Sequence, residues 1–195
     1  LFSFGLYMML INLAGSVLFN VDKVLVGQVL GPASVSYYSV PSQLTLKIHN
    51  GLAVFISFLF PMVSEAQSLG DNETLEKVFI QGMRFITLID GSVLVFIAVF
   101  SQQILGLWIN PDFASQSWFL LILTAMGYIF YALSITPYHI LLGMGRPKML
   151  AVFNLVTTLS VILGLYIGVT WFGLVGGCVG AMLGFLTAAI MPIYV

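Results

Sequence analysis

Residues 149–195 read MLAVFNLVTTLSVILGLYIGVTWFGLVGGCVGAMLGFLTAAIMPIYV and contain no Asp, Glu, Lys or Arg. A helix that crosses a bilayer needs roughly 20 apolar residues, each of which adds about 1.5 Å of length. The stretch is therefore too long for one crossing and suits two. We expect the turn between them at Trp171-Phe172-Gly173, because glycine commonly interrupts a helix.

The rest of the 195-residue chain has the same character. Charged residues make up 7% and hydrophobic residues 60%, whereas a soluble domain normally carries about a quarter charged residues. This composition excludes a soluble surface, a disordered chain and a nucleic-acid binder with a basic patch. Strands of a β-barrel would alternate in polarity, but residues 93–100 read VLVFIAVF. We predict an all-α integral membrane protein.

Together with the turn at 171–173, turn residues at 31–32, 68–72, 110–112 and 143–147 divide the chain into six predicted helices. Their predicted ranges are 3–30, 35–67, 73–108, 114–142, 148–170 and 174–195. Asp71 or Asn72 is expected to cap the third helix. Prolines inside apolar runs are expected to kink their helices; these are Pro41, Pro61, Pro137 and Pro192.

Lysine and arginine set the predicted orientation. Lys77 and Arg84 follow the second loop, and Arg146 and Lys148 lie at the fourth, whereas the first, third and fifth loops carry none. By the positive-inside rule, both ends of the chain lie on the cytoplasmic side. Aromatic residues are expected at the outer interface, namely Tyr37, Tyr38, Trp108, Trp118 and Trp171.

Glycines recur at intervals of four residues, as at small-residue faces that let helix backbones approach closely in lipid. Packing within the bundle is the expected use of these faces, and homodimerisation is the alternative. The pattern comprises Gly27, Gly31, Gly164, Gly168, Gly176, Gly180 and Gly184.

Five ionisable residues inside the predicted spans carry most of the functional information: Asp22, Lys23, Lys47, His49 and Asp90. Counted from the nearest turn at about 1.5 Å per residue, the first four lie about 12–18 Å deep on two antiparallel neighbours. A charge inside a bilayer costs at least about 2.5–3.5 kcal/mol, so it normally faces a partner or a wet cavity. We therefore predict that these five residues line a translocation cavity.

Several arrangements of these residues fit the sequence. Asp22 and Lys47 would form a salt bridge between helices, and Lys23 would leave a cationic excess suited to a phosphate headgroup. A proton or cation relay through Asp22 and Asp90 is the alternative. Asp90 alone would find a partner close by, such as Gln81 or Arg84. No linked catalytic or metal motif accompanies His49 or His139, so we expect neither an enzyme nor a cofactor.

Several segments resemble the polysaccharide-biosynthesis and O-antigen flippases of the multidrug/oligosaccharidyl-lipid/polysaccharide exporter superfamily. These are NVDKVLVGQVLG at 20–31, VSYYSV at 35–40, FPMVSE at 60–65, GMGRPK at 143–148 and FGLVGG at 172–177. Members of the family have about a dozen helices, arranged as two six-helix lobes around a central cavity.

The resemblance implies that residues 1–195 form the C-terminal lobe of such an exporter and that the N-terminal lobe is missing. It also implies a lipid-linked (polyprenyl-pyrophosphate) glycan as substrate, for cell-surface glycans such as lipopolysaccharide, and a place in the bacterial or archaeal inner membrane. Membrane lipids and the missing lobe are further expected partners, together with a glycan polymerase or glycosyltransferases. Two rivals remain: a cation-coupled multidrug extruder of the same superfamily, and a membrane scaffold for glycan assembly.

Overall fold

The computed structural model describes the backbone of residues 2–194 and the side chains of residues 5–193. Every regular element in that part of the chain is helical, as predicted. The elements are α1 (Phe2–Leu18), α2 (Val21–Leu30), α3 (Pro32–Ser57), α4 (Leu59–Leu69), α5 (Asn72–Val99), α6 (Ser101–Trp108), α7 (Pro111–Ala132), α8 (Ile135–Gly143), α9 (Pro147–Phe185) and the 3-10 helix η1 (Ala188–Tyr194).

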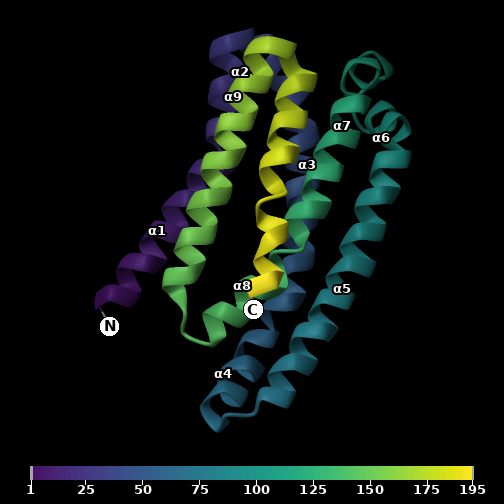
Figure 1. Ribbon diagram of the computed structural model, residues 1–195. Coiled ribbons are helices and arrows are strands. Elements are labelled where there is room, and N and C mark those ends of the chain that lie inside the picture. Colours follow the sequence, from purple (N-terminus) through teal and green to yellow (C-terminus); the bar gives the residue numbers. More distant parts are fainter. Residues whose placement is uncertain (1, 195) are drawn as a thin grey trace.

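The helices group into 5 apolar segments long enough to cross a membrane. The last of these reverses direction at Gly173, whose φ of 65° and ψ of −151° lie outside the helical region. Figure 1 shows α9 running the length of the bundle, turning sharply and returning beside itself. The predicted six-crossing membrane bundle, with its turn at Trp171-Phe172-Gly173, is thus confirmed.

Two prolines explain breaks inside the apolar segments. α3 ends at Ser57, four residues before Pro61, and α7 ends at Ala132, five residues before Pro137. Proline lacks the amide donor and its ring clashes with the carbonyl four residues earlier, so the helix is interrupted there. Pro41 lies within α3, which continues past it without a break.

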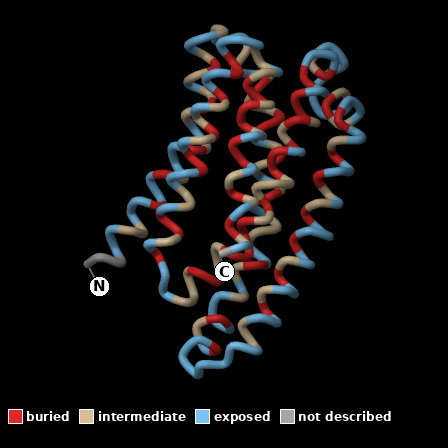
Figure 2. Tube along the Cα trace, in the orientation of Figure 1, coloured by how far each residue is buried: buried red, intermediate tan, exposed pale blue. Residues whose placement is uncertain are grey.

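Helix α7 is central to the bundle and packs against α3, α5, α6 and α9. Figure 2 shows buried residues concentrated on the sides of the helices that face one another, with exposed residues along the outer sides. The core around α7 includes the fully buried Leu121 and the nearly buried Tyr128. Tyr38 is also buried, at 4% exposure; the interfacial position predicted for it is wrong, because its ring packs into this core.

The two halves of α9 meet through glycines. A Cβ added to Gly164 would overlap the backbone of Gly180, and one added to Gly168 would overlap the backbone of Gly176. This is the close approach that small residues permit between helices in a membrane, and it confirms packing within the bundle as the use of this face. Gly31 differs: a Cβ there would contact nothing, and its φ of 85° instead serves the turn between α2 and α3.

Both ends of the chain lie at the same end of the bundle as the α4–α5 and α8–α9 turns (Figure 1). The turns near Gly31, Asn110 and Gly173 lie at the opposite end. This arrangement agrees with an even number of crossings.

Asp71 caps α5 as predicted. Its carboxylate accepts hydrogen bonds from the amide of Thr74 at 3.0 Å and from the hydroxyl of the same residue at 2.6 Å. These bonds, led by the one from the hydroxyl, lower the pKa of the Asp71 carboxylate. The contribution of the cap is therefore present above the ordinary carboxylate pKa and is lost as the pH falls through the lowered value.

Replacing Asp71 by Ala is expected to speed amide hydrogen exchange at Thr74 and Leu75 several-fold at neutral pH. The difference from the unmodified protein should shrink in acid, where the unmodified cap is itself protonated. Asp112→Ala is a suitable control, because α7 is capped by the side chain of Asn110 instead. Equal exchange rates in the Asp71 variant and the unmodified protein at pH 7 would show that this cap does not hold the first turn.

Candidate functional site

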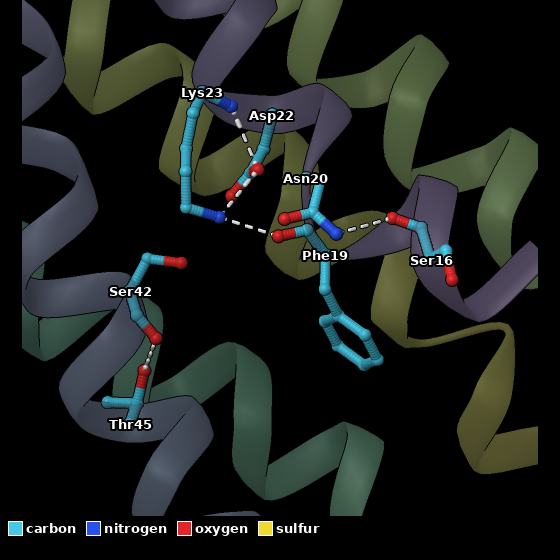
Figure 3. A network of polar contacts seen from close by, with 7 residues as sticks. All are labelled: Ser16, Phe19, Asn20, Asp22, Lys23, Ser42 and Thr45. Atoms are coloured by element: carbon cyan, nitrogen blue, oxygen red, sulfur yellow. Dashed lines mark hydrogen bonds and ion pairs between the residues drawn. The ribbon is translucent and has the colours of Figure 1, made fainter.

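Asp22 pairs with its neighbour Lys23 rather than with Lys47. A continuous helix would direct the Lys23 amide to the carbonyl of Phe19, but the helix breaks at Phe19 and Asn20. The Lys23 ammonium donates to that free carbonyl at 2.5 Å and lies 3.1 Å from Asp22 Oδ1, which also accepts from the Lys23 amide at 2.8 Å (Figure 3). The predicted Asp22–Lys47 bridge is therefore wrong, because the helix break supplies a nearer partner.

His49 and Asp90 form the second pair. The Nδ1 atom of His49 lies 3.1 Å from Asp90 Oδ2 and joins α3 to α5. His49 is 2% exposed and Asp90 is 0% exposed. Asp90 Oδ1 is buried without a hydrogen-bond partner. The prediction that Asp90 pairs with Gln81 or Arg84 on its own helix is therefore wrong, because both of those residues are exposed.

Aromatic rings surround this pair. The His49 imidazole lies with its centroid 5.4 Å from that of Tyr128 and 5.1 Å from that of Tyr131. Both tyrosines come from the central helix α7. The tyrosine rings thus cover the imidazole, and His49, but not Asp90, also lines a cavity.

Lys47 stands apart from both pairs. Its side chain is exposed on α3, and it has no ion pair or hydrogen bond within the described part of the chain. Because Asp22 and Lys23 neutralise each other, the cationic excess predicted for this cluster resides at Lys47. Of the five predicted residues, the structure thus joins four as two separate pairs and leaves the fifth exposed.

Two adjoining polar hollows lie between α1, α3, α7, α8 and α9. The first has a volume of about 190 Å³ and includes His49, Asn50 and His139 in its lining. The second, of about 440 Å³, includes Asn12 and Ser16 from α1 and Asn20 from the break after it. They share four lining residues, and we refer to the two hollows together as the polar groove; the shared residues are Phe19, Tyr131, Tyr138 and Asn154.

Exposed polar residues recur beside the polar groove. On α1, Asn12 and Ser16 are exposed four residues apart, which places them on one face of the helix. Asn20 is exposed in the break that follows α1, where its amide donates to the carbonyl of Ser16 at 2.8 Å. On α3, Gln43, Lys47 and Asn50 are exposed at similar spacing. We call these six residues the polar stripes; hydrocarbon would leave most of their hydrogen-bonding groups unsatisfied.

Asp22 faces a different and much smaller cavity of about 30 Å³, deeper in the bundle. Tyr38 and Ser42 of α3, Tyr128 of α7 and Cys178 of α9 line it as well. Asp22 and His49 therefore lie in separate cavities, although the sequence placed them at similar depth. Within residues 5–193 no group of three His, Cys, Asp or Glu side chains is arranged to hold a metal ion.

Sequence reasoning missed the uncharged residues of the polar groove, chiefly Asn50, Tyr131, Tyr138 and Asn154. The asparagines carried a signal, since an amide inside an apolar run is unusual, but the tyrosines were indistinguishable from core aromatics. His139, which no catalytic or metal motif accompanies in the sequence, lines the polar groove, with its ring 5.3 Å from that of Tyr138.

Residues 1–117 match the profile of a family described as polysaccharide biosynthesis protein. The chain belongs to this family. The match and the first relative below confirm its predicted place in the multidrug/oligosaccharidyl-lipid/polysaccharide exporter superfamily.

Two curated relatives of this polysaccharide biosynthesis family protein are longer than the chain. A "Putative O-antigen transporter" of Shigella flexneri is 24% identical over 92% of the chain, which spans 42% of that relative. An uncharacterized membrane protein of Methanocaldococcus jannaschii is 28% identical over 100% of the chain, which spans 38% of it. The chain thus spans less than half the length of both relatives.

Two crystal structures share the fold. A MATE protein in complex with MaL6 superposes with a TM-score of 0.81 at 19% identity, over 97% of this chain and 44% of that one. A point mutant of a MATE protein superposes with a TM-score of 0.77 at 19% identity, over 97% of this chain and 42% of that one. At this level of identity the likeness concerns the fold.

Proposed function

We propose that residues 1–195 form one six-helix lobe of a membrane exporter that moves lipid-linked glycans, with the polar groove as this lobe's half of the translocation cavity. The observation that carries the proposal is the pair of polar stripes. Amide, hydroxyl and ammonium groups exposed on two membrane spans would be unsatisfied against lipid. A water-filled cavity between this lobe and a second lobe satisfies them.

The chemistry of the groove suits a glycan joined to a pyrophosphate. Asn12, Asn50 and Asn154 offer both donors and acceptors for sugar hydroxyls, and Tyr131 and Tyr138 offer ring faces with polar tips. Lys47 supplies a positive charge that no acidic side chain in the described segment neutralises. A compact ammonium of this kind is a common ligand for phosphate. The name of the Shigella flexneri relative supports a glycan substrate.

The proposed location is the cytoplasmic membrane, with both ends of the chain inside the cell. Arg146, Lys148 and Lys77 lie beside the turns at the end of the bundle where both termini lie. Positive residues near short loops favour the cytoplasmic side. The Trp108 and Trp171 rings, which are 61% and 78% exposed, would then lie at the outer interface.

Replacing Lys47 by Ala in the full-length protein is expected to reduce glycan export about tenfold or more. The reason is that a hydrogen bond between the Lys47 ammonium and an anionic substrate would contribute about 1.5–3 kcal/mol. Export would be measured in cells as surface glycan per folded transporter. Lys77→Ala is the matched control, because Lys77 is exposed and already paired with Glu73. Unchanged export by the Lys47 variant at normal protein level would remove Lys47 from the mechanism.

A cation-coupled drug extruder is the second candidate, favoured by the MATE-like fold and by the buried carboxylates of Asp22 and Asp90. It predicts that Asp22→Asn or Asp90→Asn abolishes extrusion of organic cations, whereas Lys47→Ala does not reduce it. Comparing glycan export with cation extrusion in these three variants separates the two functions.

A further inference from the structure

The buried contact between His49 and Asp90 has a use beyond packing. We propose that this pair is the proton-binding site that couples export to a proton gradient. While the pair is buried, the imidazole carries a proton on each of its two nitrogens. It releases one of these two protons when water reaches the carboxylate. The inference rests on the proposed function, since the polar groove would supply the water.

Charge balance supports this assignment. With both imidazole nitrogens protonated, His49 is a cation beside the Asp90 anion, and the pair is neutral overall. Loss of one proton leaves a lone carboxylate in the interior of the bundle, where an uncompensated charge is strongly unfavourable. The closed pair therefore favours the state in which both imidazole nitrogens are protonated. Release of one proton requires that water or another cation stabilise the Asp90 carboxylate.

The unpartnered oxygen of Asp90 supports it independently. Oδ2 contacts His49, but Oδ1 is buried without any hydrogen bond. A permanently charged structural carboxylate normally satisfies both oxygens, because a bare buried acceptor is costly. A carboxylate with only one hydrogen-bonded oxygen suits a site in which water binds the other oxygen when the pair opens.

A route for the proton is present. His49 lines the hollow of about 190 Å³ in the polar groove, and its Nδ1 atom is engaged with Asp90, so Nε2 is the nitrogen left for the proton. A hydronium ion in the groove transfers its proton to Nε2 and leaves as water. The reverse transfer, toward the other side of the membrane, completes a cycle in which nothing else is consumed.

Few other ionisable groups face the pair. Tyr128 and Tyr131 approach from α7, and Tyr138 and His139 face the same hollow from α8. On α2, Asp22 is neutralised by Lys23, and Lys47 is exposed on α3 and lines neither hollow of the polar groove. The lining residues from α1, α9 and η1 in the described chain are not ionisable. His139 is thus the other group that could exchange a proton with this hollow near neutral pH.

The charge state of His49 tests the site without any substrate. We would label the histidines of the full-length protein with ¹⁵N in lipid nanodiscs at pH 7 and assign His49 and His139 by replacing each with Gln. The expected His49 signal is a doubly protonated imidazole that becomes neutral in Asp90→Asn. It should stay charged in Asp112→Asn, a control acid on the exposed first turn of α7. A neutral His49 in the unmodified protein would overturn the proposal.

Coupling is tested in proteoliposomes with a fluorescent polyprenyl-pyrophosphate-linked sugar as the probe. If one proton moves per substrate, a gradient of one pH unit shifts the accumulation ratio of the probe about tenfold. The double variant His49→Gln/Asp90→Asn keeps a neutral hydrogen-bonded pair but cannot carry the proton, so the expected shift is less than twofold. A full tenfold shift in this variant would overturn the proposal.

The two readouts separate failure of the proton site from failure of the proposed function. If the unmodified protein does not move the probe with or without a gradient, the glycan function is contradicted. The ¹⁵N measurement still decides whether His49 and Asp90 hold the proton.

Discussion

Replacing Gly180 by Leu is expected to abolish accumulation of folded protein. A Cβ at this position would overlap the carbonyl of Gly164 on the other half of α9. The obstacle is backbone, which cannot rotate away as a side chain can, so the two halves must separate along their length. Over-packing typically costs about 1–3 kcal/mol, and we expect a larger loss here. Fluorescence-detected size-exclusion chromatography of the full-length protein measures the folded fraction.

Gly91→Leu in α5 is the matched control, since a Cβ added there meets nothing within 4 Å. It should accumulate like the unmodified protein. Gly180→Ala should fall between the two, because one methyl group already overlaps the facing carbonyl but adds less bulk. Normal accumulation of Gly180→Leu would show that the halves of α9 are farther apart than described.

Replacing His49 by Leu is expected to destabilise the protein by about 3–5 kcal/mol, the usual cost of removing one partner from a buried ion pair. The loss arises because Asp90, which is 0% exposed, keeps a charge and loses its only described partner. Thermal unfolding of the full-length protein in detergent measures the effect as a lowered midpoint.

The double variant His49→Leu/Asp90→Leu provides the control for this second prediction. It removes the charge together with its partner, and replacing a buried pair by apolar residues is often neutral or stabilising. We therefore expect it to recover most of the lost stability. A His49→Leu variant as stable as the unmodified protein would mean that Asp90 is already uncharged or hydrated in the folded state.

The glycine packing also bears on the scaffold alternative. A scaffold would present Gly176, Gly180 and Gly184 to a partner protein, but the structure presses all three against the opposite half of α9. Substitutions on this face are therefore expected to damage folding whatever the protein does. The Lys47 and His49 variants, rather than the glycines, distinguish transport from scaffolding.

Much of the fold could be predicted because the relevant signals are local. The charge-free stretch 149–195 required two crossings by length alone, and the turn came at Gly173 as expected. Pro61 and Pro137 fixed two helix breaks through their missing amide donors. The break at Phe19 and Asn20 had no such marker, and the prediction of one helix over 3–30 missed it.

The sequence by itself determined the membrane environment, the number of crossings and the turns, because hydropathy and length act along the chain. Only the tertiary structure decided which charges meet. A helix turns about 100° per residue, so depth alone says nothing about the direction of a side chain. A local helix break paired Asp22 with Lys23, and helix rotation paired His49 with Asp90 and left Lys47 exposed, although all five residues looked equivalent in the sequence.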